Sequence, residues 1–186
     1  SRGLGDVYKR QGQVGSSGYL INSSTSDRVG TGGNSPEGLA LIYLFELPTL
    51  GPGVTLSNVA LQLQYTETTN SGDLDFNIDL YGIDARDEAT FTASDYYDGP
   101  AAQSSDTLIQ QAILTPTSSL GGVNVSGGAL EDFLASLYNA DGTPVARYAT
   151  FRVNPDQDFP PGSASDLIRG YLLGLDGNPT QAYPPQ

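Results

Sequence analysis

Two stretches of this chain alternate apolar and polar side chains with a period of two, which constrains the fold more than any other feature. The apolar side chains of each stretch fall on one face: Val59, Leu61, Leu63 and Tyr65 in the first, Leu74, Phe76, Ile78 and Leu80 in the second. Strands with one buried and one wet face are typical of antiparallel sheets. The short apolar run Leu39–Leu47, which ends at Pro48, predicts a further, buried strand.

Other segments predict shorter strands, and a single segment has helical spacing. We expect strands within 106–115, 123–125, 144–153 and 167–175, with short pieces at 19–21 and 90–92. Leu130, Phe133, Leu134, Leu137 and Tyr138 follow the spacing of an amphipathic helix. The sequence therefore predicts an all-β, antiparallel β-sandwich, jelly-roll-like, with one inserted short helix around residues 129–140.

The first eleven residues differ in composition from the rest of the chain. Asp6–Gln11 (DVYKRQ) resembles a translated sequencing adapter, and Ser1–Gln11 contains three of the eight basic residues. We therefore expect residues 1–11 to be a non-native leader, the alternative being a genuine basic N-terminus. Residues 12–178 are expected to form one β-sandwich domain, and residues 179–186 a proline-rich tail or linker.

The missing residue types exclude much of catalysis. The chain contains no cysteine and no histidine, and its single lysine, Lys9, lies in the first eleven residues. This excludes Cys–His and Ser–His–Asp catalysis and the usual zinc, haem and copper sites. We expect no enzyme; the alternative is a glycosidase, which would need two acids roughly 5–10 Å apart across a sugar.

The charge of the chain disfavours some classes of binding partner. Beyond residue 11, the chain contains five arginines and twenty acidic side chains. Such a surface repels phosphate and anionic lipid, so we expect no nucleic-acid partner. No apolar run approaches the length of a membrane-spanning helix, so we also expect no membrane insertion.

Residues 45–63 resemble a known kind of bacterial module. Phe45–Pro48 (FELP), a Gly/Pro turn and Val54–Leu63 (VTLSNVALQL) are similar to the exported jelly-roll modules of the DNRLRE and PEP-CTERM surface-protein type. The resemblance covers roughly residues 39–92, with Phe91 where the modules usually have tryptophan and with a helix outside their pattern. It implies a secreted, cell-surface β-sandwich, and it transfers no catalytic residues.

Acidic loops are the candidate metal sites. Oxygen-only clusters with flexible spacing suit a structural Ca²⁺, and solvated acidic loops are the alternative interpretation. The candidate ligands are Asp84, Asp87, Glu88, Asp95, Asp98, Asp156, Asp158 and Asp176.

Candidate sugar sites are of two kinds. Tyr96 and Tyr97 are the one adjacent aromatic pair that could stack on a bound sugar, with tyrosines packed at loop bases as the alternative. Asn22 and Asn124 begin N-x-S motifs and are candidates for covalent glycosylation.

These features together favour a structural role over a catalytic one. We expect a non-enzymatic, extracellular or cell-surface structural subunit of a filament, sheath or biofilm matrix. Its partner would be itself, a homopolymer that is glycosylated and stiffened by calcium, with strand addition near residues 12–21 as a route to assembly. The alternative function is a carbohydrate-binding or adhesive surface module.

Overall fold

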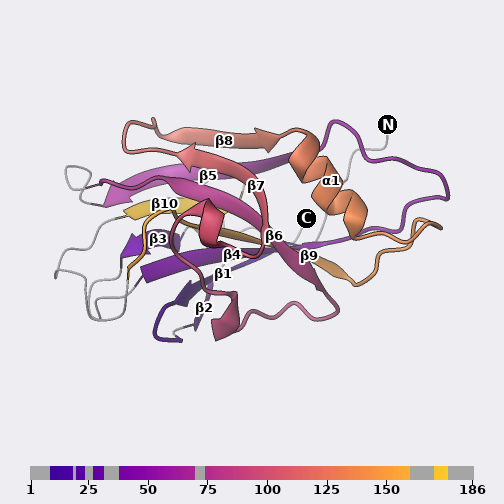
Figure 1. Cartoon of the computed structure of the whole chain (residues 1–186), viewed down its shortest axis with the longest axis horizontal. Coiled ribbons are helices and arrows are strands. Elements are labelled where there is room, and N and C mark those ends of the chain that lie inside the picture. Colours follow the sequence, from indigo (N-terminus) through magenta and orange to yellow (C-terminus); the bar gives the residue numbers. More distant parts are fainter. Residues whose placement is uncertain are drawn as a thin grey trace.

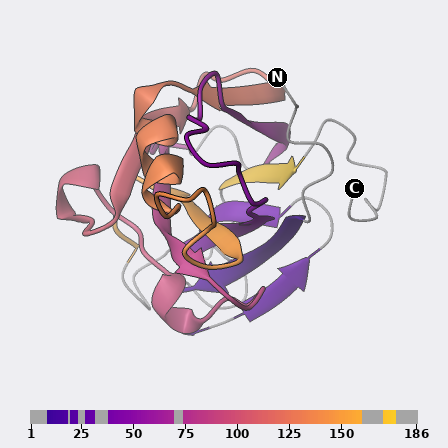
Figure 2. The same ribbon diagram turned by 90° about the vertical axis from the view of Figure 1, so that its right-hand side faces the viewer.

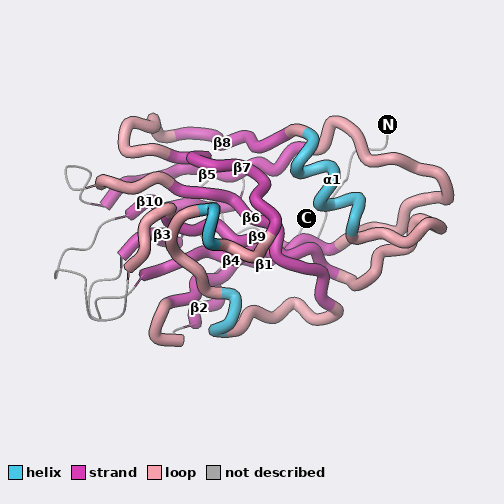
Figure 3. The backbone as a smooth tube through the Cα atoms, viewed as in Figure 1, coloured by secondary structure: helices cyan, strands magenta, loops and turns pink. Residues whose placement is uncertain are grey.

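The computed structural model describes residues 9–18, 20–23, 27–31, 38–69, 74–159 and 170–175. This part of the chain forms ten strands, one α-helix and two short 3₁₀ turns (Figures 1 and 3), which confirms the predicted all-β fold with a short helix. The elements are β1 (Lys9–Gly15), β2 (Leu20–Ser23), β3 (Asp27–Thr31), β4 (Gly38–Glu46), β5 (Ala60–Thr69), β6 (Ile78–Arg86), η2 (Ala93–Asp95), η3 (Ala101–Gln103), β7 (Thr107–Leu114), β8 (Gly121–Ser126), α1 (Gly128–Ser136), β9 (Tyr148–Pro155) and β10 (Gly170–Leu175).

The strands form one antiparallel, strongly curled sheet. Its order is β7-β6-β9-β4-β3-β10-β5-β8. β9 and β3 pair with successive parts of one edge of β4, and β1 pairs along the opposite edge. β2 then pairs with β1. Short pairing between β3 and β4, at Gly30–Leu39 and Thr31–Gly38, joins the two halves. Figure 2 shows these halves as two layers, with β8 in one, β1 and β4 in the other, and α1 along one side. The result is sandwich-like.

The main core lies between the two layers and follows the period-two pattern. In β9, Ala149, Phe151 and Val153 point inward, and in β5 Leu61 and Leu63 do the same. This alternation places the apolar side chains of both layers against one another.

The helix α1 closes one side of this core. Its buried residues are Leu130 and Phe133, and Phe133 packs edge-on against Phe151 at 5.2 Å between ring centroids. A Cβ at Gly82 would lie 2.5 Å from the Phe133 ring, so only glycine leaves room for this contact.

The opposite face of β4, β6 and β9 is also buried, and we call it the covered face. Its side chains alternate with those of the main core: Ala40, Ile42, Leu44, Asp79, Tyr81, Tyr148, Thr150, Arg152 and Asn154. Val14 and Phe91 join the apolar members in a second core cluster, and Tyr96 packs on it. The connection between β6 and β7, residues 87–106, supplies Phe91 and Tyr96. Burial on both faces explains why the β4 sequence is a continuous apolar run.

Several predicted boundaries are wrong. The helix spans Gly128–Ser136 rather than 129–140, because Tyr138 leaves it to form an isolated bridge with Pro144. Residues 90–92 do not form a strand; Thr92 is the N-cap of η2. In the segment predicted as a strand at 144–153, the strand β9 begins only at Tyr148 and continues to Pro155.

The N-terminal strand includes part of the segment that composition sets apart. β1 pairs with β4 from Lys9–Phe45 to Gly15–Leu39, so residues 9–11 are in a strand. The side chain of Gln11 is buried, and its Nε2 donates to the Leu173 carbonyl oxygen at 3.2 Å. Residues 1–8 and the predicted tail, 179–186, lie outside the described residues.

Candidate functional site

Arg152 is the centre of a buried polar cluster on the covered face. Its guanidinium lies against two aromatic rings that also contact each other, with Cζ 5.1 Å from the Tyr81 ring centroid and 5.0 Å from that of Tyr97. Its Nη2 is 2.7 Å from Asp106 Oδ2, and its Nε donates to Asn154 Oδ1 at 3.0 Å. The charge is therefore stacked, paired and hydrogen-bonded within the chain.

Arg86 forms ion pairs with two of the predicted metal ligands, Asp84 and Asp95. Its Nη1 and Nη2 donate to both oxygens of Asp95, at 2.7 and 2.6 Å, and its Nε is 2.9 Å from Asp84 Oδ1. Burial lowers the pKa of Arg86, but the hydrogen bonds to Asp95 and Asp84 outweigh it and raise the pKa above its ordinary value. Asp84 and Asp95 thus neutralise an arginine in this structure.

Two further predicted ligands, Asp98 and Asp158, lie together. Asp98 Oδ2 accepts a hydrogen bond of 2.6 Å from the backbone N–H of Phe159. Burial and then the adjacent Asp158 carboxylate raise the pKa of Asp98, although the nearby Tyr96 hydroxyl and the hydrogen bond from Phe159 oppose the shift. The Asp158 carboxylate therefore disfavours the charged form of Asp98.

The remaining candidate ligands do not join this pair. Asp156 accepts hydrogen bonds of 2.8 Å from the backbone N–H and the side-chain amide of Asn77, and Asp87 and Glu88 are exposed in a bend. Asp176 lies outside the described residues. Within the described ranges no group of three or more His, Cys, Asp or Glu side chains could hold a metal ion. A calcium site stays a prediction.

One buried carboxylate, Asp79, was not among the predicted site residues. It is 2 % exposed, and its Oδ1 accepts a 2.8 Å hydrogen bond from the backbone N–H of Ala112 while Oδ2 accepts one of 3.3 Å from the Tyr81 hydroxyl. Burial, and secondarily the charge of Asp156, raise the pKa of Asp79. The alternation in β6 assigned Asp79 to a wet face, and no local signal corrects that assignment.

The two tyrosines predicted to contact sugar are packed into the loop. Tyr97 stacks on Arg152, packs edge-on against Tyr81 and donates its hydroxyl to the Pro100 carbonyl oxygen at 2.8 Å. The Tyr96 hydroxyl is buried beside Asp98 and Gly38, and burial first, then Asp98, raise the pKa of Tyr96. Tyr96 and Tyr97 are each half-buried by these contacts, and sugar binding by either ring stays a prediction.

A second surface, on the outside of β5 and β8, is polar but uncharged. We call it the amide face: Ala60, Gln62 and Gln64 of β5 lie opposite Ser126, Asn124 and Gly122 of β8. Their neighbours Leu61, Leu63 and Val125 point into the main core. Asn124, one predicted glycosylation site, is exposed here, whereas for Asn22 the structure describes only its place in β2.

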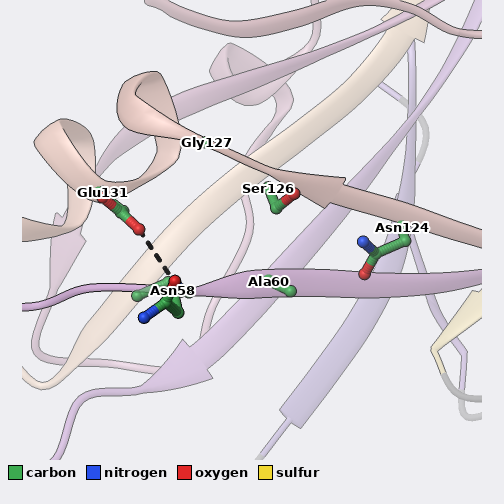
Figure 4. A pocket seen from close by; sticks show the side chains of 7 residues that line it. Asn58, Ala60, Asn124, Ser126, Gly127 and Glu131 are labelled. Atoms are coloured by element: carbon green, nitrogen blue, oxygen red, sulfur yellow. Dashed lines mark hydrogen bonds between the residues drawn. The ribbon is translucent and has the colours of Figure 1, made fainter.

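The amide face ends in an open pocket of about 390 Å³ beside the start of α1 (Figure 4). Glu131 Oε1 accepts a hydrogen bond of 3.4 Å from the backbone N–H of Val59. The other lining residues are Asn58, Ala60, Asn124, Ser126 and Gly127. Glu131 is the single acid of this lining, so the pocket lacks the carboxylate pair that glycoside hydrolysis requires.

The strands at the borders of the sheet form the third feature of interest. In the part of the chain that the structure describes, β2, β7 and β8 each pair with a neighbour on one side only. No member of these three strands is charged, although the chain has a net charge of −13. Sequence reasoning placed a strand-addition edge at residues 12–21 and did not identify β7 or β8 as edges.

Comparisons of the chain with protein-family models, curated proteins and solved structures gave no match. The resemblance to DNRLRE and PEP-CTERM modules therefore stays a prediction. Among the helices in the described ranges, none combines the length and the apolar character needed to cross a bilayer.

Proposed function

We propose that this protein is a non-enzymatic, secreted structural subunit that associates with copies of itself into an extracellular filament, sheath or matrix. The observation that carries the proposal is the set of uncharged edge strands, β2, β7 and β8, in a strongly acidic chain. Edge strands expose backbone donors and acceptors, and soluble sheets usually protect them with charged side chains or proline. Uncharged edges favour pairing with another chain.

The state of the acidic groups supports a non-catalytic role. The carboxylates of Asp84, Asp95 and Asp106 pair with arginines, and Asp79 accepts hydrogen bonds within the chain. In the pocket of the amide face, Glu131 has no second acid among the lining residues. These groups bind partners within the fold, which supports a structural role for them; the adjacent carboxylates among the described residues are Asp98 and Asp158.

Calcium would strengthen such an assembly by offsetting its negative charge. Asp98 and Asp158 are the pair that could contribute ligands, but two carboxylates supply fewer oxygens than the roughly six to eight that Ca²⁺ takes. The described residues do not complete a site. If calcium binds, chelation should lower the melting temperature of the wild type and leave an Asp98→Asn variant unaffected.

Sedimentation of the full chain over a range of concentrations tests self-association. Because the subunits carry like charge, association should increase as salt rises from about 0.05 to 0.5 M and screens their repulsion. Electron microscopy of the concentrated sample should then show polymers. A chain that sediments as a monomer at every concentration and salt level would contradict the proposal.

A neutral polysaccharide is a second candidate partner, because the amide face and its pocket present amide and hydroxyl groups without net charge apart from Glu131. Binding should then retard the protein in gels containing the polysaccharide. The double variant Gln62→Ala/Asn124→Ala should lose this retardation, whereas Tyr97→Phe should keep it.

A further inference from the structure

We propose that β8 is the edge at which two copies pair, as antiparallel strands related by a two-fold axis through Asn124. This inference rests on the proposed self-association and names its interface. A β8–β8 pair would join the layers of two molecules into one continuous sheet, and growth beyond this pair would need a second contact outside β8.

β8 is the most regular of the three edge strands. All six of its residues pair with β5 in unbroken register, from Gly121–Tyr65 to Ser126–Ala60. By contrast, β7 shifts register twice against β6, and Ala112 within it has a positive φ of 49° and gives its N–H to Asp79. Such irregularity protects an edge, and β2 is only four residues long. The β8 edge is therefore the best template for an added strand.

The sequence of β8 suits a second copy of itself. A strand edge repeats backbone donors and acceptors with a spacing that another extended chain matches. The segment Val123-Asn124-Val125 reads the same in both directions, so an antiparallel copy would place like side chains opposite one another. β8 carries no charge, so two acidic molecules can meet there with little local repulsion, whereas a cationic partner would be drawn to the acidic loops instead.

Symmetry selects the register. The two apolar inner faces should lie on the same side of the joined sheet, so residues directly opposite each other must point to the same face. Under two-fold symmetry this requires one residue to lie opposite its own copy, with the axis between the two. An axis at Asn124 places Val123 opposite Val125 of the partner subunit, and Gly122 opposite Ser126 of the partner subunit. Val123 is half-buried against the core, so this pairing would complete its burial.

The competing axis, at Val123, gives a poorer match. It would place Val125 opposite Gly121 of the partner subunit and would leave that valine without an apolar cross-strand neighbour. Cross-strand pairs of β-branched residues stabilise sheets more than pairs with glycine. With the axis at Asn124, the two Asn124 amides face each other on the exposed side and can hydrogen-bond.

Because the chain contains no cysteine, single cysteines report this geometry directly. At the axis the two Cα atoms would lie about 4.5–5.5 Å apart, within the range that a disulfide spans. Asn124→Cys should form a covalent dimer on mild oxidation, read on a non-reducing gel. Ser126→Cys should not, because its two copies would be roughly 13 Å apart along the strand. A Ser126→Cys dimer forming as fast as that of Asn124→Cys would overturn the register.

Lysine variants test the interface without a covalent bond. Asn124→Lys would bring two ammonium groups together at the axis and should weaken self-association about ten-fold or more in sedimentation. The matched control is Gln62→Lys, on the same face and directly opposite Asn124 on β5. Its two copies would be roughly 14 Å apart, so it should associate like the wild type.

The outcomes separate this inference from the function it rests on. If the wild type associates and Asn124→Lys associates equally well, self-assembly stands and the β8 interface is wrong. If the wild type is always monomeric, both fail. A glycan on Asn124, detected by peptide mass in protein from its natural source, would block the edge and overturn the interface alone.

Discussion

The two outer faces of this sheet follow the same alternating pattern, but one is buried and the other is exposed to solvent. On the covered face, formed by β4, β6 and β9, outward side chains are buried beneath residues 87–106, and Asp79 and Arg152 are each 2 % exposed. On the amide face, Gln62 and Asn124 are exposed and uncharged. The difference teaches that a sheet face can hold buried charged side chains where other parts of the chain supply their partners, whereas the amide face carries no charge and stays exposed.

This contrast has an energetic consequence. A buried charge is tolerated only when it is paired and hydrogen-bonded, so the covered face depends on a complete set of partners. Exposed amides depend on no partner, because water satisfies them. Substitutions on the covered face should therefore affect stability strongly, and those on the amide face should affect association instead.

The largest expected effect is at Arg152. Arg152→Met would leave Asp106 without its partner and remove the cation that contacts two tyrosine rings, which should lower the free energy of unfolding by about 3–5 kcal/mol. Urea denaturation measures the change.

Arg147 provides the control for Arg152, since its side chain is 59 % exposed against 3 %. Arg147→Met breaks its pair with Glu46 and should change stability by less than about 1 kcal/mol. Equal effects of the two substitutions would show that the covered face is open to water.

A glycine on each face gives the second comparison. A Cβ at Gly38 would overlap the Tyr96 hydroxyl and lie 2.7 Å from Asp98 Oδ2, whereas at Gly122 the nearest atom is 4.0 Å away. Gly38→Ala should therefore push the loop outward and cost about 1–3 kcal/mol in urea denaturation. Gly122→Ala should stay within about 0.5 kcal/mol of the wild type. A neutral Gly38→Ala would mean that residues 96–98 do not pack on β4.

The sequence predicted well what depends on neighbouring residues. The alternation correctly placed Leu61, Leu63 and Tyr65 in the core, and it placed Leu74 and Phe76 there even though β6 begins only at Ile78. The alternation of apolar and polar residues predicts which side chains are buried. It does so for any extended segment, including one that is not hydrogen-bonded to a neighbouring strand.

What the sequence could not predict depends on contacts far along the chain. Asp79 looked exposed because the backbone N–H that it binds, at Ala112 in β7, lies 33 residues later in the sequence. Asp84 and Asp95 are the exception, because Arg86, which binds both, lies only two and nine residues away. The spacing of Asp84 and Arg86 in one strand was a local signal for an ion pair that the interpretation as metal ligands did not use. The edge position of β8 follows from the strand order, which the segment GGVNVS does not encode by itself.

The smallest of the expected effects concerns pH and Asp79. Burial raises its pKa in the folded protein, so the folded state holds this proton more tightly than the unfolded state does. The contribution of Asp79 to stability is thus fully present below the unfolded value, near 3.9, and is lost as pH rises through the raised folded pKa. The nearby Asp156 charge adds to the shift, and the Ala112 and Tyr81 hydrogen bonds reduce it.

Asp79→Asn removes this titration while keeping an oxygen for the Ala112 N–H. The stability of the variant relative to the wild type should therefore rise as pH increases from about 4 to 7, by about 1.4 kcal/mol for each unit of the pKa shift. Urea denaturation at a series of pH values gives the difference. The matched change on the other face, Gln62→Glu, introduces an exposed carboxylate and should show almost no such trend. A flat difference for Asp79→Asn would mean that water reaches Asp79, and the contrast between the two faces would then be one of packing rather than of solvation.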